Sequence, residues 1–416
     1  DDGHNGTYVL PIAQNNNGWE TTIRIAHFGD YDDFNDSLVN VTATLYGSAG
    51  QGVAGQSAVV NLQIRPGGIA SFDLSDHVGD DWVGSVFITS SAPIGAVAER
   101  SKSEEQMLVM NTSRPENFET EIQYAPLVFK EYNFWNTGIS VANTDPDNWN
   151  SVTVTYYGPT MNQVGQDTLS IPPRGMEFVY TPGGQELGLS EGFVGSARIS
   201  GTAPFHAAVD QVKYFGNDPD VGQAMSYIVE DRLARYWEFE FPRLDEFTSI
   251  VMEDFDFGDL MALPLAQKGN PITGEGDTSG IQLFNTSATN SVQAEVTFYG
   301  ANGNPVAPTV DNNDKNPMIV TLGANQSYTI YTHGLTELSA GFSGSALVEV
   351  AGGGGGIVGV SNNVNYDVSS DGAAAYNLVT TFPIWQFINE LIIEQLCEVG
   401  EEGAVIECIL FVDSPD

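Results

Sequence analysis

The sequence predicts an all-β protein made of three tandem antiparallel β-sandwich units. One phrase occurs three times, as DDWVGSVFITSSAP from Asp80, SEGFVGSARISGTAP from Ser190 and SAGFSGSALVEVAGG from Ser339. Polar and apolar residues alternate with a period of two in and around each copy, as in strands that bury one face. Turn motifs such as GSAGQG, RPGG, PPRG and GANGN recur about every eight to twelve residues, the spacing of a sandwich with about seven short strands.

Each unit opens with a strand that contains a proline, and an alternating strand follows. The opening strands are YVLPIAQ from Tyr8, YAPLVFK from Tyr124 and MALPLAQ from Met261. The second strands are TIRIAHF from Thr22, GISVANT from Gly138 and GIQLFNT from Gly280. The same segments in the same order indicate one structural unit repeated three times.

The third strand of each unit ends in a shared tyrosine, at Tyr46, Tyr157 and Tyr299. Aligned on these tyrosines, one face is apolar in every copy, and the other is mostly Thr, Gln, Glu and Tyr. The apolar faces are Val41, Ala43 and Leu45, then Val152, Val154 and Tyr156, then Ala294, Val296 and Phe298. This alternation is typical of half-buried strands in an antiparallel sheet.

The repeated glycine phrase also alternates. In the second copy it puts Phe193, Gly195, Ala197 and Ile199 on the buried face and Ser196 on the polar face. Glycine weakens a strand unless another group approaches closely. We therefore expect an aromatic ring from the facing sheet to lie over the glycine.

A catalytic interpretation would make Ser85, Ser196 or Ser345 a nucleophile, which needs a base within hydrogen-bonding reach. The five histidines occupy no equivalent positions in the three units, and no copy contains GxSxG. A serine on a flat strand also lacks the sharp turn that exposes such a nucleophile. We therefore interpret the phrase as architecture and predict that the protein is not an enzyme.

The expected boundaries place the sandwiches at residues 1–104, 120–218 and 261–370. Residues 226–260 are aromatic and acidic and predict an inserted arm or linker. The tail, residues 376–416, opens with TTFPIWQ, which resembles a fourth opening strand. We expect a short amphipathic helix next, then a cysteine loop and the strand AVIECILFV; the apolar positions of the helix are Ile384, Phe387, Ile388, Leu391 and Ile392.

The chain is strongly acidic, with 54 Asp and Glu against 14 Lys and Arg and a net charge of −40. Such a surface repels phosphate backbones and anionic lipid headgroups, so we expect neither nucleic acid nor membrane as a partner. The apolar runs fall far short of the roughly 20 residues that a membrane-spanning helix needs.

Two features favour an extracellular location. The segment DDGHNGTYVLP at the start contains no methionine and no basic, apolar leader, which fits a mature chain whose export signal has been removed. Cys397 and Cys408 are the two cysteines and have no zinc or haem spacing. We expect them to form a disulfide, which an oxidising compartment would maintain.

Clusters of carboxylates suggest calcium as a ligand. The candidate residues are Asp30 and Asp32 in GDYDDFND and Asp145 and Asp147 in DPDNWN. Neither cluster has the EF-hand spacing, because Phe34 and Trp149 fall where an oxygen ligand is required. Solvated loops on an acidic protein are the favoured alternative, and no other cofactor is suggested.

Exposed aromatic side chains suggest a sugar-stacking platform. The candidates are Trp19, Trp135, Trp149, Tyr31 and Phe34. Trp19 and Trp135 hold the same repeat position, which favours core packing for these two.

Three tandem sandwiches marked by VTVTYYG, GFVGS and a following AP before an aliphatic strand resemble the immunoglobulin-like repeats of bacterial and archaeal secreted surface proteins. These include adhesin stalks, surface layers and extracellular fibres. The resemblance extends from Thr7 to Asp367, although the immunoglobulin cysteine pair and core tryptophan pattern are absent. It implies an extracellular, non-catalytic scaffold or binding role.

The leading functional hypothesis is a structural subunit of a self-assembling fibre or surface layer. An apolar strand without a unit of its own should pair with another edge, and head-to-tail strand addition builds a homopolymer. The candidate assembly residues are Phe382, Ile384, Trp385, Val405, Ile409 and Phe411. The alternative is a cell-surface adhesin or carbohydrate-binding protein, and the third hypothesis is a secreted hydrolase.

Overall fold

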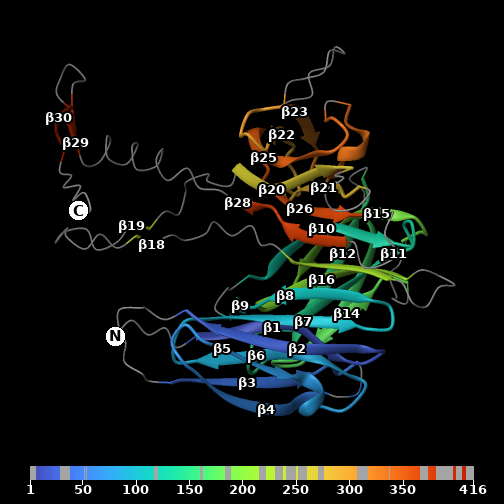
Figure 1. The fold of residues 1–416 in the computed structure, drawn as a ribbon, viewed down its shortest axis with the longest axis vertical. Helices are drawn as coiled ribbons and strands as arrows, with labels where there is room; N and C mark the ends of the chain where they lie inside the picture. The colour runs from blue at the N-terminus through green and yellow to red at the C-terminus, as the bar shows by residue number, and fades with distance from the viewer. Residues whose placement is uncertain are drawn as a thin grey trace.

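The computed structural model describes residues 6–28, 38–50, 52, 54–116, 120–159, 163–182, 189–214, 222–229, 238–239, 250–251, 260–269, 276–306, 317–336, 338–365, 373–380, 397–399 and 405–408. The described residues form six antiparallel sheets of four or five strands and two small strand pairs. The six sheets associate in pairs as three successive units (Figure 1). The predicted all-β, antiparallel architecture is confirmed.

Unit 1 contains sheet 1a, ordered β4-β3-β6-β1-β9, and sheet 1b, ordered β5-β2-β7-β8. Its strands are β1 (Gly6–Asn15), β2 (Trp19–His27), β3 (Val39–Gly47), β4 (Gly55–Ile64), β5 (Ile69–Asp73), β6 (Trp82–Ser90), β7 (Ile94–Lys102), β8 (Met107–Thr112) and β9 (Arg114–Pro115).

Unit 2 contains sheet 2a, ordered β10-β15-β12-β13, and sheet 2b, ordered β14-β11-β16-β17. Its strands are β10 (Ile122–Lys130), β11 (Trp135–Asn143), β12 (Asn150–Tyr157), β13 (Gln163–Ile171), β14 (Met176–Tyr180), β15 (Phe193–Ser200), β16 (Phe205–Tyr214) and β17 (Gly222–Ile228).

Unit 3 contains sheet 3a, ordered β23-β22-β25-β20-β28, and sheet 3b, ordered β24-β21-β26-β27. Its strands are β20 (Leu260–Lys268), β21 (Thr278–Asn285), β22 (Val292–Gly300), β23 (Met318–Leu322), β24 (Ser327–Tyr331), β25 (Phe342–Gly353), β26 (Ile357–Val364), β27 (Ala373–Asn377) and β28 (Val379–Thr380).

The strand order departs from the immunoglobulin-like arrangement that the sequence suggested. In immunoglobulin domains the first two strands share a sheet, whereas here β1 and β2 lie in different sheets of unit 1, and the other units repeat this. Each unit also ends in an additional strand, β8, β17 or β27, which extends the units beyond the expected boundaries at residues 104, 218 and 370. The spacing of turn motifs in the sequence predicts the approximate number of strands, but it does not determine which strands pair.

The proline of each opening strand coincides with an irregularity in pairing. The register of β1 against β6 shifts between Leu10 and Ala13, and the equivalent shifts lie between Ala125 and Val128 and between Leu263 and Ala266. Each interval contains the proline of YVLPIAQ, YAPLVFK or MALPLAQ. Proline cannot donate to the ladder and is tolerated in a strand at such a bulge, so the repeated proline fixes the bulge.

The predicted buried faces are confirmed. The apolar residues of β3, β12 and β22 are almost completely buried and belong to three different hydrophobic clusters, of which that of unit 2 also includes Val360 and Val364 of β26. Each unit therefore has its own hydrophobic core between its two sheets.

The expectation for the repeated glycine was wrong in one respect. A Cβ on Gly195 would lie 2.4 Å from the ring of Phe193 and 2.2 Å from the carbonyl oxygen of Tyr157. Gly84 has the same relationship to Trp82 and Tyr46, and Gly344 to Phe342 and Tyr299. The ring thus comes from the same strand, two residues earlier, and not from the facing sheet. Residues two apart share a face of a strand, so the ring can fold over the glycine.

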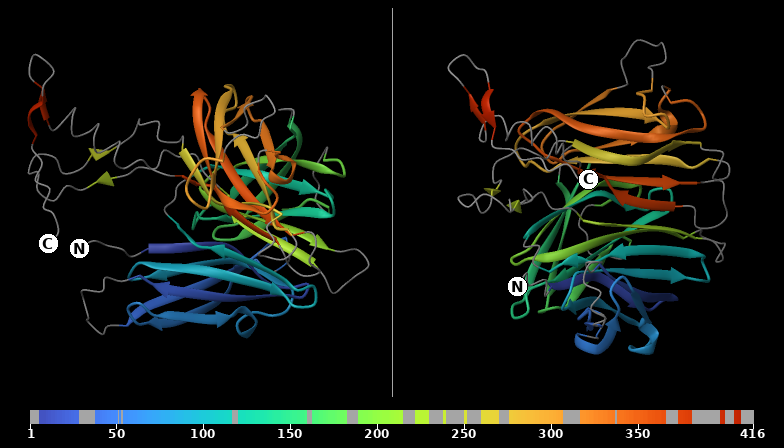
Figure 2. Two further views of the ribbon diagram at one scale, coloured as in Figure 1. Left: turned by 45° about the horizontal axis from the view of Figure 1, so that its top comes forward. Right: turned by 60° about the vertical axis from the view of Figure 1, so that its left-hand side comes forward.

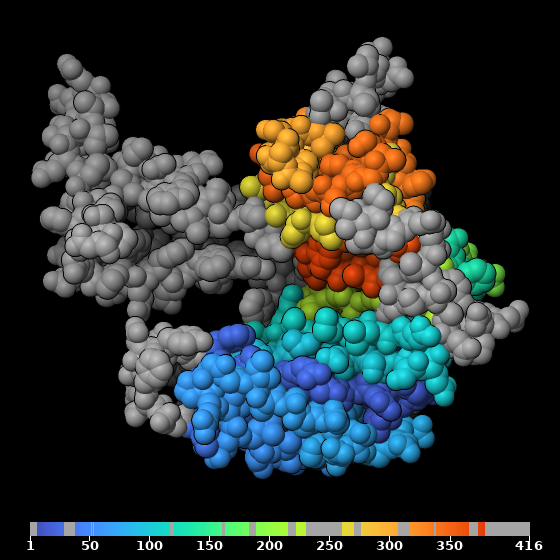
Figure 3. Space-filling view, in the orientation of Figure 1, coloured from blue at the N-terminus to red at the C-terminus, as the bar shows by residue number. Residues whose placement is uncertain are grey.

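The three units stack through the outer faces of their sheets. Sheet 1a packs on sheet 2b, and sheet 2a packs on sheet 3b. Part of sheet 1b, including β8, also packs directly on sheet 2b. The units follow one another in the order 1, 2, 3 (Figure 2). The edge strand β17 packs against both β8 and β27 along one side. Figure 3 shows unit 1 and unit 3 at opposite ends of this stack.

The expected arm and tail are only partly described. In the arm, β18 (Glu238–Phe239) pairs with β19 (Ile250–Val251). In the tail, β28 pairs with β20, and β29 (Cys397–Val399) pairs with β30 (Val405–Cys408). The predicted helix at Ile384–Ile392 lies outside the described residues. No helix in the described part of the chain is long and apolar enough to cross a membrane.

Candidate functional site

The contact between units 1 and 2, which we call seam 1–2, is apolar at its centre. Val9, Ile12, Val83 and Phe87 of sheet 1a pack against sheet 2b. Their partners are the buried residues Ala142, Met176, Ala208 and Ile228. Small side chains on sheet 2b allow the two sheets to approach closely.

Beside this apolar centre lies a buried ion pair. The Arg100 side chain, 1% exposed, donates from Nη1 to Oδ2 of Asp210 at 2.7 Å and from Nη2 to Oδ1 at 2.5 Å. Arg100 Nη2 also donates to Asn111, and the Asn111 amide donates to Ser226. Arg100 and Asn111 belong to unit 1 and Asp210 and Ser226 to unit 2, so this network joins the two units.

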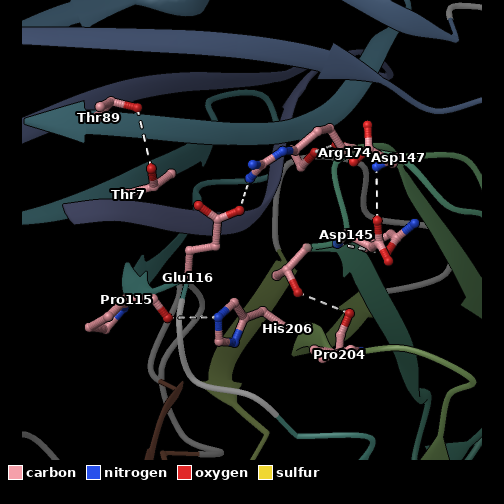
Figure 4. A network of polar contacts seen from close by, with 12 residues as sticks. Thr7, Thr89, Pro115, Glu116, Asp145, Asp147, Arg174, Pro204 and His206 are labelled. Atoms are coloured by element: carbon pink, nitrogen blue, oxygen red, sulfur yellow. Dashed lines mark hydrogen bonds and ion pairs between the residues drawn. The ribbon is translucent and has the colours of Figure 1, made fainter. Parts of the chain in front are cut away.

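A second polar group joins the units where the chain passes between them (Figure 4). The Nε2 of His206 lies 2.9 Å from the Pro115 carbonyl oxygen, and Arg174 forms an ion pair with Glu116. Arg174 also lies over the ring of Phe87, 4.8 Å from its centroid. Burial lowers the pKa of His206 to about 4, with a further contribution from the charge of Arg114. His206 is therefore neutral at physiological pH, when Nε2–H donates to Pro115.

The contact between units 2 and 3, seam 2–3, is built from the equivalent sheets. Tyr124 and Tyr157 of sheet 2a pack against Phe284 of sheet 3b, with ring centroids 5.8 and 6.1 Å apart. Gln223 donates to the carbonyl oxygen of Asn365, and Asn377 donates to that of Ile228. Seam 2–3 is thus joined by hydrogen bonds from side-chain amides to backbone carbonyl oxygens, whereas seam 1–2 is joined by a buried ion pair.

A groove of about 700 Å³ opens in seam 2–3. The equivalent position of seam 1–2 holds a cavity of about 190 Å³, lined partly by Arg100 and Asp210. Among the described residues, none that lines the larger groove is charged. Its side chains are aromatic, aliphatic, hydroxyl and amide, and they include Phe129, Tyr132, Gln282, Tyr328, Tyr331 and Asn362.

The aromatic rings of the groove come from both units. Tyr132 stacks on Phe129 in unit 2, with centroids 5.7 Å apart and an interplanar angle of 11°. Tyr328 and Tyr331 lie on β24 of unit 3 and are partly exposed. Burial raises the pKa of Tyr331, and the neighbouring Tyr132 hydroxyl raises it further. Tyr132 and Tyr331 thus line the same groove from opposite sides of the seam.

The hairpin that carries Tyr132 has an unusual backbone. Asn133 and Phe134 have φ values of 48° and 70°, and the equivalent turn of unit 1 has Asn17 and Gly18 at 49° and 79°. Glycine adopts this left-handed conformation without cost, but an aromatic residue there is strained. Phe134 is nevertheless 68% exposed, so core packing does not explain its presence.

The two ends of the stack expose apolar side chains. On the outer face of sheet 1b, Ile69, Leu108 and Met110 are exposed, and exposed Phe28 lies against Gly95. On the outer face of sheet 3a, Leu265 and Ile319 are exposed. These positions are the surfaces on which a further unit would continue the stack.

The candidate nucleophiles occupy equivalent strand positions in the sheets. Ser85 is buried and donates to the carbonyl oxygen of Arg174 at 3.0 Å. Ser196 is also buried, and Ser345 is partly buried on β25. No hydrogen bond from these three hydroxyls to a histidine or carboxylate is found among the described residues.

The carboxylate of Asp145 is used within its own loop. Its Oδ1 accepts hydrogen bonds from the backbone N–H groups of Asp147 and Asn148 at 2.8 and 2.9 Å. These bonds hold the pKa of Asp145 below its ordinary value. Among the described residues, no cluster of three or more His, Cys, Asp or Glu side chains is arranged to hold a metal ion. Asp30 and Asp32 lie outside the described residues.

Of the aromatic candidates for a sugar-stacking platform, the two that share a repeat position are buried, as that position predicted. Trp19 and Trp135 are buried, while Trp149 is 61% exposed and does not line the groove. Tyr31 and Phe34 lie outside the described residues. No sequence pattern distinguished Tyr132, Tyr328 and Tyr331 from other tyrosines. One signal was available, because Phe134 stands at a turn position that glycine holds in unit 1.

The cysteines and the candidate assembly residues fall in the tail. Cys397 and Cys408 are directly opposite each other in the β29–β30 pair, and Val405 pairs with Val399. Phe382, Ile384, Trp385, Ile409 and Phe411 lie outside the described residues.

No protein-family model matches the chain, and no curated protein is significantly similar to it. Among solved structures, a GH78 family rhamnosidase of Bacillus sp. GL1 aligns with 92% of this chain at 8% sequence identity. The alignment covers 56% of that protein, so the chain spans little more than half of its length, and the TM-score is 0.14. A similarity of this size supports no conclusion about fold or function.

Proposed function

We propose that this protein is a non-catalytic, extracellular structural subunit that assembles by stacking copies end to end, as in a fibre or surface layer. One observation carries the proposal: the outer faces of sheets 1b and 3a are equivalent to faces that already pack together inside the chain. Sheet 3a corresponds to 1a and 2a, and sheet 1b corresponds to 2b and 3b.

The match extends to individual residues of sheet 3a. By register, Leu265 corresponds to Ile12 and Leu127, which are buried in the two seams, yet Leu265 is 38% exposed. Leu347 of sheet 3a occupies the position of Phe87, and Tyr299 that of Tyr46. The positions that form the apolar seam are therefore uncharged on this open face.

The opposite face matches in the same way. Ile69 corresponds to Met176, which is buried in seam 1–2, but Ile69 is 73% exposed. Glu99 corresponds to Asp210, and Glu99 already pairs with Arg24 of its own sheet, so this carboxylate would enter a seam with its counter-charge. Apolar patches of this kind on a soluble protein mark interaction surfaces.

Because the two faces differ, their contact is heterologous, and such a contact that does not close into a ring builds a filament. The repeat pattern that resembles secreted surface proteins supports the same function. The opposed Cys397 and Cys408 support an oxidising environment, where a disulfide would close the tail hairpin.

Sedimentation velocity over a range of concentrations tests the proposal. Leu265→Asp and Ile69→Asp each place a charge on one end face and should abolish association. Val59→Asp is the matched control, since Val59 is exposed on the edge strand β4, away from both end faces. A wild-type chain that stays monomeric, or association that the two end-face variants retain, would contradict the proposal.

A further inference from the structure

We propose that the groove in seam 2–3 binds a neutral oligosaccharide. The proposal does not depend on assembly, because the groove lies within one chain and away from both end faces. It rests on the contrast between two equivalent seams, on the composition of the groove and on the backbone of the hairpin beside it.

The two seams are built from the same positions but differ in volume. Asp210 and Tyr180 pair with Gly138 in seam 1–2, and Asn362 and Tyr331 pair with Gly280 at the equivalent positions of seam 2–3. An aspartate that forms a buried ion pair in the first seam is thus a neutral amide in the second. The first seam leaves a cavity of about 190 Å³, whereas the second leaves about 700 Å³, which is room for more than one sugar ring.

The charge of the groove selects for a neutral ligand. The chain has a net charge of −40, yet the residues that line this groove in the described part of the chain are all uncharged. A cationic ligand would find no carboxylate to pair with among these lining residues, and the net negative charge of the chain would repel an anionic one. A neutral, hydroxyl-rich ligand fits both conditions.

The side chains of the groove match the two surfaces of a pyranose ring. One face of the ring presents C–H groups, which pack on aromatic rings such as Tyr132, Tyr328 and Tyr331. Its edge presents hydroxyls, which both donate and accept hydrogen bonds, as the Asn133, Gln282 and Asn362 amides do. An apolar, aromatic lining with a few polar groups is typical of small-molecule sites.

The hairpin at the mouth of the groove indicates function. Phe134 stands in a left-handed backbone position that Gly18 occupies in unit 1. Backbone strain of this kind lowers the stability of the folded chain, and strained residues cluster at binding sites. The same turn supplies Tyr132 and Asn133 to the groove, and the Phe134 ring next to them in sequence is exposed.

Affinity electrophoresis of the purified full chain tests the proposal. The neutral probes are soluble mannan, β-glucan, arabinoxylan and galactomannan, and the charged comparators are polygalacturonate and chitosan. We expect at least one neutral polysaccharide to retard the wild type. Tyr331→Ala and Tyr132→Ala should each weaken this binding about tenfold, as loss of a stacking ring does for nucleic-acid bases. Trp149→Ala, which removes an exposed ring outside the groove, should bind as the wild type does.

Two further variants separate binding from folding. Tyr331→Phe keeps the ring and should retain most of the affinity. Phe134→Gly should raise the midpoint of thermal unfolding while it weakens binding, an opposite pair of changes that a purely structural residue would not give. The proposal is overturned if no neutral polysaccharide retards the wild type, if Tyr331→Ala and Trp149→Ala bind equally well, or if a proline-rich peptide such as decaproline binds the groove instead.

Discussion

Arg100 and Asp210 form a two-pronged ion pair that joins units 1 and 2, with Nη1–Oδ2 and Nη2–Oδ1 distances of 2.7 and 2.5 Å. Each charge is neutralised by a residue of the other unit. Removal of either residue would leave an uncompensated charge buried in the seam. The pair therefore couples the stability of the two units.

Asp210→Ala should destabilise the protein by about 3–5 kcal/mol, the cost of leaving a buried arginine without its carboxylate. Denaturant unfolding monitored by tryptophan fluorescence measures this loss. Glu99→Ala is the control, because the Arg24–Glu99 pair is solvent-exposed and such pairs contribute about 0–1 kcal/mol. Equal losses in the two variants would contradict the role given to Arg100 and Asp210.

Gly195→Ala should cost about 1–3 kcal/mol or more, because the new methyl group would overlap the Phe193 ring and the Tyr157 carbonyl. Thermal unfolding detects a loss of this size. Gly334→Ala is the matched control, since a Cβ there meets nothing within 4 Å; its effect should stay within about 0.5 kcal/mol. If Gly195→Ala were neutral, the packing explanation of the repeated phrase would be wrong.

Asp81→Gly should stabilise unit 1 by up to about 1 kcal/mol. Asp81 has a φ of 68°, and the equivalent residues of units 2 and 3 are Gly192 and Gly341, at 78° and 82°. The substitution should raise the denaturant midpoint. Asp80→Gly, one residue earlier and outside the left-handed region, should give no such gain, and a gain in both variants would rule out backbone strain as the cause.

His206 should make stability depend on pH. The folded chain keeps the ring neutral down to a pH of about 4, whereas the unfolded chain takes up a proton near pH 6.5. The unfolded state therefore binds more protons between these values, so stability is highest above pH 6.5, falls as the pH is lowered to about 4, and receives no further loss from His206 below that. The total effect is about 3 kcal/mol.

Unfolding free energies of the wild type and His206→Gln, measured from pH 4 to pH 8, isolate this effect from the titration of carboxylates. The difference in unfolding free energy between the two proteins should change between about pH 4 and pH 6.5 and be constant above pH 6.5. A difference that is independent of pH would show that His206 titrates normally in the folded protein.

The sequence predicted what lies within a unit better than what lies between units. Alternation correctly identified the buried Val152, Val154 and Tyr156, because a period of two depends only on the local strand. It did not predict that the outer face would also be covered, with Tyr124 buried and Tyr157 partly buried, since a face of mixed polarity is compatible with either water or another sheet. The groove depends on the relative placement of units 2 and 3, which no local pattern encodes.

The central claim, that copies stack through the outer faces of sheets 3a and 1b, is tested most directly by negative-stain electron microscopy. Wild-type protein at physiological salt should form filaments whose subunits repeat along the stacking axis, and Leu265→Asp should give single particles under the same conditions. Single particles from the wild type at every concentration, or filaments from Leu265→Asp that match those of the wild type, would contradict the claim.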